Sequence, residues 1–212
     1  MSQPIQKFFT SDLHFFHNNI LKFTNRPYSS LDEMHEDIVT EWNKNVSRGS
    51  VVYHLGDLSF LKAKKMEDQK PLYEILNRLN GTIIMLKGNH DYSNYWKHHK
   101  EAIESGMLRT GIFFEDSPYK ELRVRGDGIR TKFVLCHYPI VSWNTQSHGS
   151  IHLHGHCHGS LGLDLGRAMD VGYDSLYNQF GFKHPINLVE VYDHLKDKEI
   201  HVVDHHNPKE GN

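Results

Sequence analysis

The first half of the chain alternates short apolar runs with longer amphipathic stretches. Residues 5–11, 51–55 and 82–87 are rich in β-branched and aromatic side chains, and each run is short enough for a buried strand. Between these runs, apolar side chains recur at helical spacing over residues 31–46 and again over residues 72–79. This order predicts a β-α-β-α-β unit, in which parallel strands are joined by right-handed crossovers.

Residues that favour helix ends flank both predicted helices. Ser30 and Glu33 form a capping-box pattern before the first helix, and Gly49 follows that helix. Asn80 and Gly81 follow the second helix, where a left-handed turn residue is expected. These end signals agree with the apolar spacing, so both helices are predicted at the same places by two independent patterns.

The second half of the chain is predicted to be strand-rich, with shorter gaps between elements. An α/β half followed by a β-rich half predicts an α/β fold, in which two packed mixed β-sheets form a β-sandwich core flanked by α-helices. No repeat or linker divides the 212 residues, so we expect a single domain without a cap domain. The strands predicted in this half cover residues 119–125, 132–136, 151–154, 168–171, 187–192 and 200–203.

Polar side chains that suit metal binding follow most of the predicted core strands. Because the carboxyl ends of parallel strands share one edge of a sheet, and neighbouring strands lie about 5 Å apart, these side chains should converge. The chain also contains 18 histidines, an excess that fits metal or acid–base chemistry. The candidate ligands are Asp12, His14, Asp57, Asn89, His137, His156 and His158.

Seven oxygen and imidazole ligands are more than one tetrahedral ion needs, and they suit two ions that share a ligand. Asp57 is the natural bridge, because it follows the second of the three predicted parallel strands. Cys157 is excluded from the set, because in an extended segment it points away from its neighbours His156 and His158.

Five motifs in this order resemble the calcineurin-like metallophosphoesterase superfamily. They are D-x-H at 12–14, G-D at 56–57, G-N-H-D at 88–91, a lone histidine at 137 and G-H-x-H at 155–158. The small single-domain bacterial and phage branch is most similar, because D-L-H-F at 12–15 is followed by H-N-N-I and then N-R-P at 25–27. The resemblance covers about three quarters of the chain, and no motif of the superfamily supports it after Gly172.

The resemblance implies two divalent metal ions, with manganese expected and iron, zinc or nickel as alternatives. It also implies hydrolysis of a phosphate ester by a metal-bound hydroxide, without a covalent intermediate. Asp57 would bridge the ions. The first ion would be held by Asp12, His14, Asp57 and His158, and the second by Asp57, Asn89, His137 and His156.

Four further residues are expected to act beside the metals. His90 would protonate the leaving oxygen, and Asp91 would orient His90, with an N-cap for a helix that begins near Ser93 as the alternative for Asp91. His17 and Arg26 lie on the long loop after the first strand and are expected to contact the substrate, since arginine suits bidentate phosphate contacts. The alternative for both is a surface loop position. The roles of His152, His154, Trp143 and His148 stay open.

An uncapped site favours a phosphodiester, because the second ester group needs room. We therefore expect a phosphodiesterase that acts on a nucleotide or a related small molecule. A phosphomonoesterase, including a protein phosphatase, is the first alternative. A nuclease is disfavoured by the formal net charge of −2, and a non-catalytic metal-binding module is disfavoured by the complete ligand set.

The remaining features concern location. No apolar run is long enough to cross a bilayer, and MSQPIQKFFTSDL is not a signal peptide, so we expect no membrane association. Two cysteines, Cys136 and Cys157, do not make a disulfide framework, which favours a reducing, cytoplasmic setting. The tail over residues 204–212 is expected to be solvated. The oligomeric state stays open.

Overall fold

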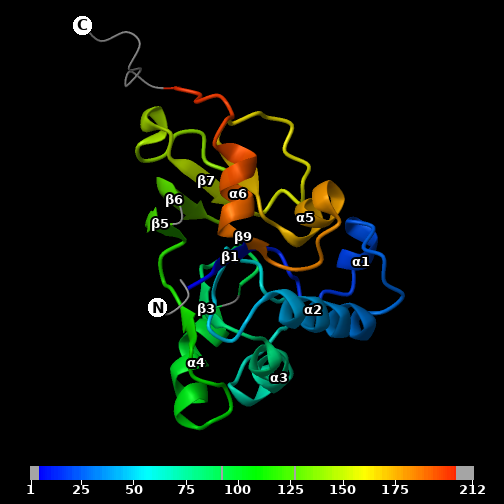
Figure 1. Cartoon of the computed structure of the whole chain (residues 1–212). Helices are drawn as coiled ribbons and strands as arrows, with labels where there is room; N and C mark the ends of the chain where they lie inside the picture. Colours follow the sequence, from blue (N-terminus) through cyan, green and yellow to red (C-terminus); the bar gives the residue numbers. More distant parts are fainter. Residues whose placement is uncertain (1–4, 92, 127, 204–212) are drawn as a thin grey trace, which may run out of the picture.

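The computed structural model describes residues 5–91, 93–126 and 128–203, except the side chains of residues 93–95. These residues form an α/β fold with two mixed β-sheets and six α-helices (Figure 1). The tail over residues 204–212, expected to be solvated, lies outside the described residues.

The first sheet contains the three strands predicted in the first half of the chain. Strands β1 (Lys7–Thr10), β2 (Val51–His54), β3 (Thr82–Met85) and β4 (Ile112–Phe114) run parallel, and β9 (Ile186–Asn187) pairs antiparallel with β1. The strand order is β4-β3-β2-β1-β9. The carboxyl ends of β1, β2 and β3 therefore share one edge, as the β-α-β-α-β prediction requires.

The second sheet has the order β5-β6-β7-β8. Strand β5 (Tyr119–Gly126) is antiparallel to β6 (Ile129–Cys136), whereas β6, β7 (Ile151–His154) and β8 (Ala168–Asp170) are parallel to one another. The carboxyl ends of β6, β7 and β8 therefore also share an edge. Both sheets are mixed, as predicted.

Aromatic and aliphatic side chains pack between the two sheets. The ring of Phe9 on β1 stacks on Tyr53 of β2, with ring centroids 5.7 Å apart, and on Phe133 of β6 at 5.8 Å. Leu135 and Leu153 of the second sheet belong to the same buried cluster. This layer joins the sheets into the predicted packed pair.

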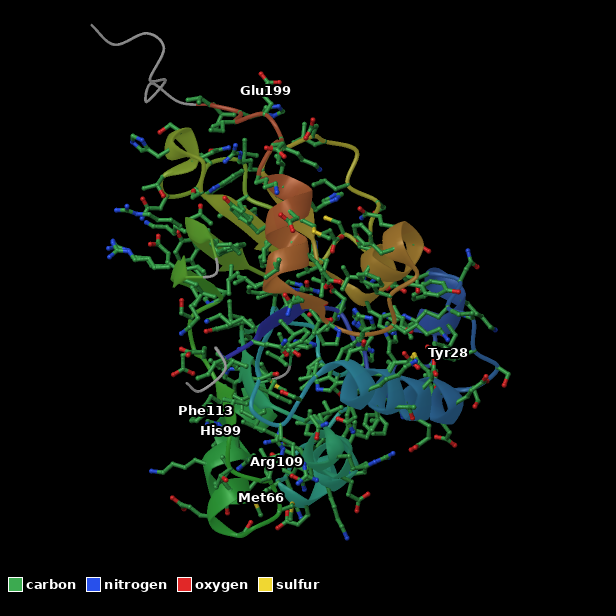
Figure 2. All side chains as sticks on the ribbon, in the orientation of Figure 1. Tyr28, Met66, His99, Arg109, Phe113 and Glu199 are labelled. Carbon is green, nitrogen blue, oxygen red and sulfur yellow. The ribbon has the colours of Figure 1, made fainter. Side chains whose placement is uncertain are left out.

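Helices cover the other face of the first sheet. The apolar stripes of α2 (Leu31–Asn45) and α3 (Lys70–Arg78) form one buried cluster with residues of β2 and β3. The predicted cap is present, because Ser30 Oγ accepts a hydrogen bond of 3.2 Å from Glu33 N. Arg109 lies next to these helices, where its guanidinium donates to the backbone oxygen of Leu79 at 2.9 Å (Figure 2). The other helices are α1 (Ile20–Phe23), α4 (Ser93–Glu104), α5 (Tyr173–Phe180) and α6 (Leu188–Leu195), with 3₁₀ turns at Glu67–Gln69 and Gln146–His148.

Two strand predictions near the C-terminus are wrong. Residues 187–192 were expected to be a strand, but only Asn187 belongs to β9, and α6 begins at Leu188. A capping box explains the helix: Asn187 Oδ1 accepts from Val189 N, and the Glu190 carboxylate accepts from Asn187 N. Residues 200–203 form no strand.

Among the helices of the described residues, none combines the length and the apolar character needed to cross a bilayer.

Candidate metal centre

The loops after β1 and β2 stay paired beyond the ends of their strands. Asp12 N donates to Gly56 O at 3.0 Å, and His14 N donates to Asp57 O at 3.1 Å. Because the backbone bonds continue in register, the side chains of Asp12, His14 and Asp57 are carried to the same edge of the first sheet.

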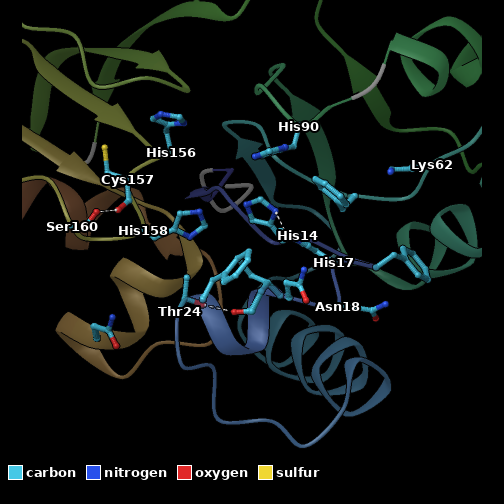
Figure 3. Close-up of a pocket in the computed structure, with 16 residues that line it drawn as sticks. His14, His17, Asn18, Thr24, Lys62, His90, His156, Cys157, His158 and Ser160 are labelled. Carbon is cyan, nitrogen blue, oxygen red and sulfur yellow. Dashed lines mark hydrogen bonds between the residues drawn. The ribbon is translucent and has the colours of Figure 1, made fainter.

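The second sheet delivers its polar loops to the same place. His156 N donates to the Asp12 carboxylate at 2.9 Å, and Gly155 N donates to His137 O at 2.9 Å. Ser11 forms an isolated parallel bridge with Gly172, just after β8. The rings of His14, His90 and His158 consequently surround one space (Figure 3).

Backbone strain is concentrated at the candidate ligands. In the described residues, eight non-glycine residues have a positive φ. Such left-handed conformations cost about 1 kcal/mol or more per residue and gather at functional sites. The surrounding structure therefore holds the backbone of these positions in an unfavourable conformation. Five of the eight are candidate ligands: Asp12 (58°), His14 (52°), Asp57 (55°), His156 (70°) and His158 (49°).

Close packing explains two motif glycines. A Cβ atom at Gly88 would collide with the backbone nitrogen and the Oδ1 atom of Asp57. A Cβ atom at Gly155 would collide with Ser11 Oγ and with the Asp12 carboxylate. Any larger residue at either position would displace a candidate ligand, so these glycines are required by the site itself.

Asp57 lies between the two halves of the candidate ligand set. Its Oδ2 atom is 3.6 Å from His14 Nε2 and also 3.6 Å from His137 Nε2. His14 Nε2 is in turn 3.8 Å from Asp12 Oδ1. Two groups could each hold a metal ion, because their ligand atoms lie within 4.8 Å of one another: Asp12 with His14 and His158, and Asp12 with Asp57 and His137.

Two atoms of this centre are buried without a hydrogen-bond partner among the described residues: Asp12 Oδ1 and His14 Nε2. Burying a polar atom without a partner costs about 1–3 kcal/mol, and more for a charged group. Burial also raises the pKa of Asp12 well above its usual value and that of Asp57 to about 7. A cation bound by these atoms would remove both costs, so the residues fit a metal ion.

The second half of the candidate set also presents lone pairs that suit a cation. His137 Nδ1 lies 2.9 Å from Leu55 O, and because a carbonyl only accepts, Nδ1 carries the proton. Burial lowers the pKa of His137 to about 4, so the ring is neutral and its Nε2 presents a lone pair. That lone pair faces Asn89 Oδ1 at 3.0 Å, and Asn89 Oδ1 is also 2.8 Å from His156 Nδ1. A cation between His137 Nε2 and Asn89 Oδ1 would be bound by the lone pairs of both atoms.

Arg26 does not occupy the predicted position of a substrate contact. The residue is 5% exposed, and its Nε and Nη2 atoms donate to the Asp174 carboxylate at 2.8 and 2.9 Å. The remaining donors reach the backbone oxygens of Leu13 at 2.8 Å and Asp12 at 2.7 Å. The prediction is therefore corrected. The guanidinium of Arg26 makes its hydrogen bonds inside the protein, where it holds the loop that carries the candidate ligands Asp12 and His14.

The sequence interpretation missed Asp174. Its Oδ2 atom accepts from His158 Nδ1 at 2.7 Å, which leaves His158 Nε2 as the nitrogen that would bind a metal ion. Burial opposes ionisation, but hydrogen bonds from Arg26 and His158 hold the pKa of Asp174 well below its usual range. Carboxylates that fix the tautomer and orientation of ligating histidines are common around metals. Its position at the start of α5, just after β8, was the available signal.

Asp91 also differs from its prediction. Its carboxylate accepts from Asp57 N at 2.8 Å, Leu58 N at 2.9 Å and Gly88 N at 2.7 Å. In the described part of the chain it makes no hydrogen bond to the ring of His90. Asp91 thus ties the loops after β2 and β3 together instead of orienting His90. The N-cap alternative involves residue 92, which lies outside the described residues.

His90 and His17 both line a pocket with a volume of about 1030 Å³, which is also lined by His14, His156 and His158 (Figure 3). His90 N donates to Asp57 Oδ1 at 2.8 Å, which fixes its backbone beside the centre. Burial lowers the pKa of His90 below its usual value. His17 Nδ1 lies 3.3 Å from His14 Nδ1, so His17 contacts a candidate ligand as well as the pocket.

His152, whose role was open, is a structural residue. Its Nδ1 donates to Val134 O at 3.0 Å, and its Nε2 accepts from Ile140 N at 3.2 Å. Trp143 is buried against Val134 and Leu165, so it does not form a wall of the pocket. His154 Nδ1 lies 3.0 Å from Gly155 O, and His148 ends the 3₁₀ turn Gln146–His148.

We expect His152 to make the fold acid-sensitive. Burial lowers its pKa to about 4, whereas the unfolded chain titrates near 6.5, so the unfolded state binds more protons between these values and stability falls as pH drops through this window. His152→Gln should cost about 1–3 kcal/mol at pH 7.5 through lost hydrogen bonds, but should flatten the pH dependence. Urea unfolding of the wild type and the variant at pH 7.5 and 5.0 measures the loss of stability and its pH dependence. Equal pH dependence in the two proteins would refute this role.

No family model matches the chain. Over 148 residues the chain is 34% identical to an uncharacterized protein of Methanocaldococcus jannaschii, a match that spans 70% of this chain and 66% of that protein. The chain thus matches just under two thirds of that relative's length. A solved structure of a protein of unknown function from Aquifex aeolicus has a TM-score of 0.60 and 21% identity, covering 90% of this chain and 99% of that one. At this identity, the likeness shows a shared fold.

Proposed function

We propose that this protein is a phosphoesterase with a two-metal centre, related to the calcineurin-like metallophosphoesterases, and that it hydrolyses a phosphodiester of a nucleotide or a related small molecule. Asp57 carries this proposal. Its Oδ2 atom lies 3.6 Å from one imidazole nitrogen of each half of the ligand set, which is the position expected of a carboxylate shared by two ions.

The chain's own residues supply the rest of the chemistry. Asp12, His14, Asp57 and His158 would hold one ion, and Asp57, Asn89, His137 and His156 the other. When bound, two divalent ions lower the pKa of a shared water and neutralise the charge of a phosphoryl group. Manganese is the ion we propose on the basis of the resemblance, and iron, zinc and nickel are alternatives, because oxygen and imidazole ligands suit all four. Asn89 is a neutral oxygen ligand, so it adds no negative charge that would repel the substrate.

His90 would act as the general acid. It lines the same pocket as His14 and His158, and its ring centroid is 5.6 Å from that of His14. A group at this position reaches an ester oxygen on the substrate side of the metals. The pocket of about 1030 Å³ supports a diester, since it leaves room for a second ester group beside the reacting phosphate.

A paired assay tests the proposed function. Protein stripped of metal and reloaded with manganese should hydrolyse bis-p-nitrophenyl phosphate faster than p-nitrophenyl phosphate. Faster turnover of the monoester would replace the diesterase with a phosphatase. No turnover of either substrate by protein that binds two metal ions per chain would contradict an esterase of broad specificity and favour a binding role.

His90→Ala should keep both metals but lower turnover of an alkyl phosphodiester by about 100-fold or more, the range of general acid catalysis. The same variant should lose less of its turnover on a substrate with p-nitrophenol as leaving group, because this leaving group needs little protonation. His98→Ala, a change of a histidine on α4, is the matched control. Loss of metal from His90→Ala would show that His90 is a ligand.

A further inference from the structure

Beside the candidate metal centre, the pocket has a wall made of three rings: Phe23, His17 and Phe60. The rings of His17 and Phe60 are stacked, with centroids 4.2 Å apart and planes inclined by 13°. Phe23 meets the His17 ring edge-on at 6.0 Å. All three residues line the pocket of about 1030 Å³. We call these three residues the aromatic wall.

The aromatic wall is continuous with the centre at two points. The His17 ring lies 5.2 Å from the ring of His14, and the Phe60 ring lies 5.2 Å from the ring of His90. A molecule whose phosphate lies at His14 and His90 therefore extends directly onto these rings. This continuity favours another part of the same substrate as the occupant of the wall over a separate ligand or a protein partner.

Hydrogen bonds between the loops that carry the candidate ligands support one ring of the wall, Phe60. Phe60 N donates to Phe15 O at 2.8 Å, and Ser59 Oγ donates to the same oxygen at 3.2 Å. These bonds join the loop after β1 to the loop after β2. These bonds hold the backbone of Phe60 in place, and a stacking surface that is already formed lowers the entropy cost of binding a planar group.

Phe23 stands out because its side chain is exposed while it lines a pocket. The residue is 70% exposed, although it lies on the short helix α1 beside buried Ile20. A planar substrate group stacked on the wall would cover apolar surface that is now open to water. Burying such surface is worth about 25 cal/mol per Å².

Lys62 adds a positive charge at the opposite side of the pocket from His156 and Cys157 (Figure 3). Its side chain is exposed, and it takes part in none of the ion pairs found in the described residues. An ammonium group in this position suits a phosphate other than the one at the metal centre. The aromatic wall suits the base of a nucleotide, and the Lys62 ammonium group suits one of its phosphates.

We propose that the aromatic wall binds the base of a nucleotide substrate and that Lys62 binds a further phosphate of the same molecule. This inference rests on the proposed function, because the wall is placed by the phosphate at the metal centre. It narrows the substrate to a phosphodiester that contains a nucleoside and at least one additional phosphate.

Binding, measured without turnover, tests this assignment. AMP and ribose 5-phosphate carry the same phosphate and differ in the base, so calorimetry on the manganese-loaded protein isolates the base. Stacking of a base on an aromatic side chain is worth about 5- to 150-fold in affinity, from about 1–3 kcal/mol. We expect AMP to bind at least about 10-fold more tightly than ribose 5-phosphate.

Phe23→Ala should reduce the preference for AMP by about fivefold or more. Phe113→Ala is the matched control, because Phe113 on β4 is also a largely exposed phenylalanine, at 53%, and does not line the pocket. ADP should bind more tightly than AMP, and Lys62→Gln should abolish this gain, whereas Lys64→Gln should not. Phe23→Ala and Lys62→Gln both alter exposed side chains, so these two variants should fold normally.

The outcomes separate the two proposals. Equal affinities for AMP and ribose 5-phosphate, or an AMP preference that survives Phe23→Ala, would overturn the base site even if phosphodiesters are hydrolysed. A base preference that depends on Phe23 in a protein that hydrolyses no phosphodiester would support the site and contradict the proposed function. If ADP still binds more tightly than AMP by the same factor in Lys62→Gln, then Lys62 does not bind the further phosphate.

Discussion

Asp57→Asn is expected to abolish phosphodiester hydrolysis and to lower metal affinity by at least about 100-fold. Residues that only support ligands cost about 10–100-fold in affinity when they are changed, so a shared ligand should cost more. The amide keeps an oxygen that can accept from His90 N, as Asp57 Oδ1 does at 2.8 Å, so the loop should retain its conformation. Metal content per chain and turnover of bis-p-nitrophenyl phosphate measure the two effects.

The same variant should have a contrasting effect on the metal-free protein. Burial raises the pKa of Asp57 to about 7 against an unfolded value near 3.8, so ionisation of this group destabilises the metal-free fold increasingly as pH rises from about 4 to about 7. Asp57→Asn removes that cost, and the metal-free variant should unfold at a higher temperature than the metal-free wild type at pH 8. It should also lose most of the stabilisation that manganese gives.

Asp116→Asn, a change of an exposed carboxylate, is the control for both measurements. Its metal content, turnover and unfolding temperature should equal those of the wild type. An Asp57→Asn protein that binds two manganese ions and remains active would refute the bridging role.

The convergence of the candidate ligands could be predicted from the sequence, because it depends on the topology of the strands. Asp12, Asp57 and Asn89 each follow a parallel strand, and strand ends meet at one edge whatever the packing around them. His137 and His156, which follow strands of the second sheet, were predicted to converge with them for the same reason. The prediction needed only correct strand positions and the order of the motifs.

Residues that depend on long-range side-chain packing could not be predicted in this way. Arg26 and Asp174 are 148 positions apart, and no local pattern indicates that they meet. Arg26, on a loop beside the candidate metal centre, was predicted to contact the substrate, because a single sequence does not show which side chains are buried. The strand expected over residues 187–192 is wrong for another reason: Leu188, Val189, Val191 and Tyr192 are residue types that strands also favour, whereas the capping box of Asn187 and Glu190 starts a helix.

Arg26→Leu should lower the free energy of unfolding by about 3–5 kcal/mol, the usual cost of leaving one partner of a buried ion pair unpaired. Asp174 is only 3% exposed and would keep its charge without the guanidinium, and the backbone oxygens of Leu13 and Asp12 would lose their donors. Arg26→Lys should recover only part of the loss, because an ammonium group cannot make the two parallel bonds to the carboxylate. Urea unfolding of the metal-free proteins measures these differences. A normal free energy of unfolding with a raised KM in Arg26→Lys would restore Arg26 as a substrate contact.

A double-mutant cycle separates the ion pair from the role of Asp174 at the metal. Asp174→Asn alone should lower metal affinity by about 10–100-fold, because the hydrogen bond of 2.7 Å to His158 Nδ1 loses its charged acceptor. In the Arg26→Leu/Asp174→Asn protein neither charge of this ion pair remains, so its loss of stability should be smaller than the sum of the two single losses by about 0.5–3 kcal/mol. Its metal affinity should stay low, because the neutral amide still faces His158. If the stability losses add and metal affinity is normal, then Arg26 and Asp174 act independently, and His158 is oriented without them.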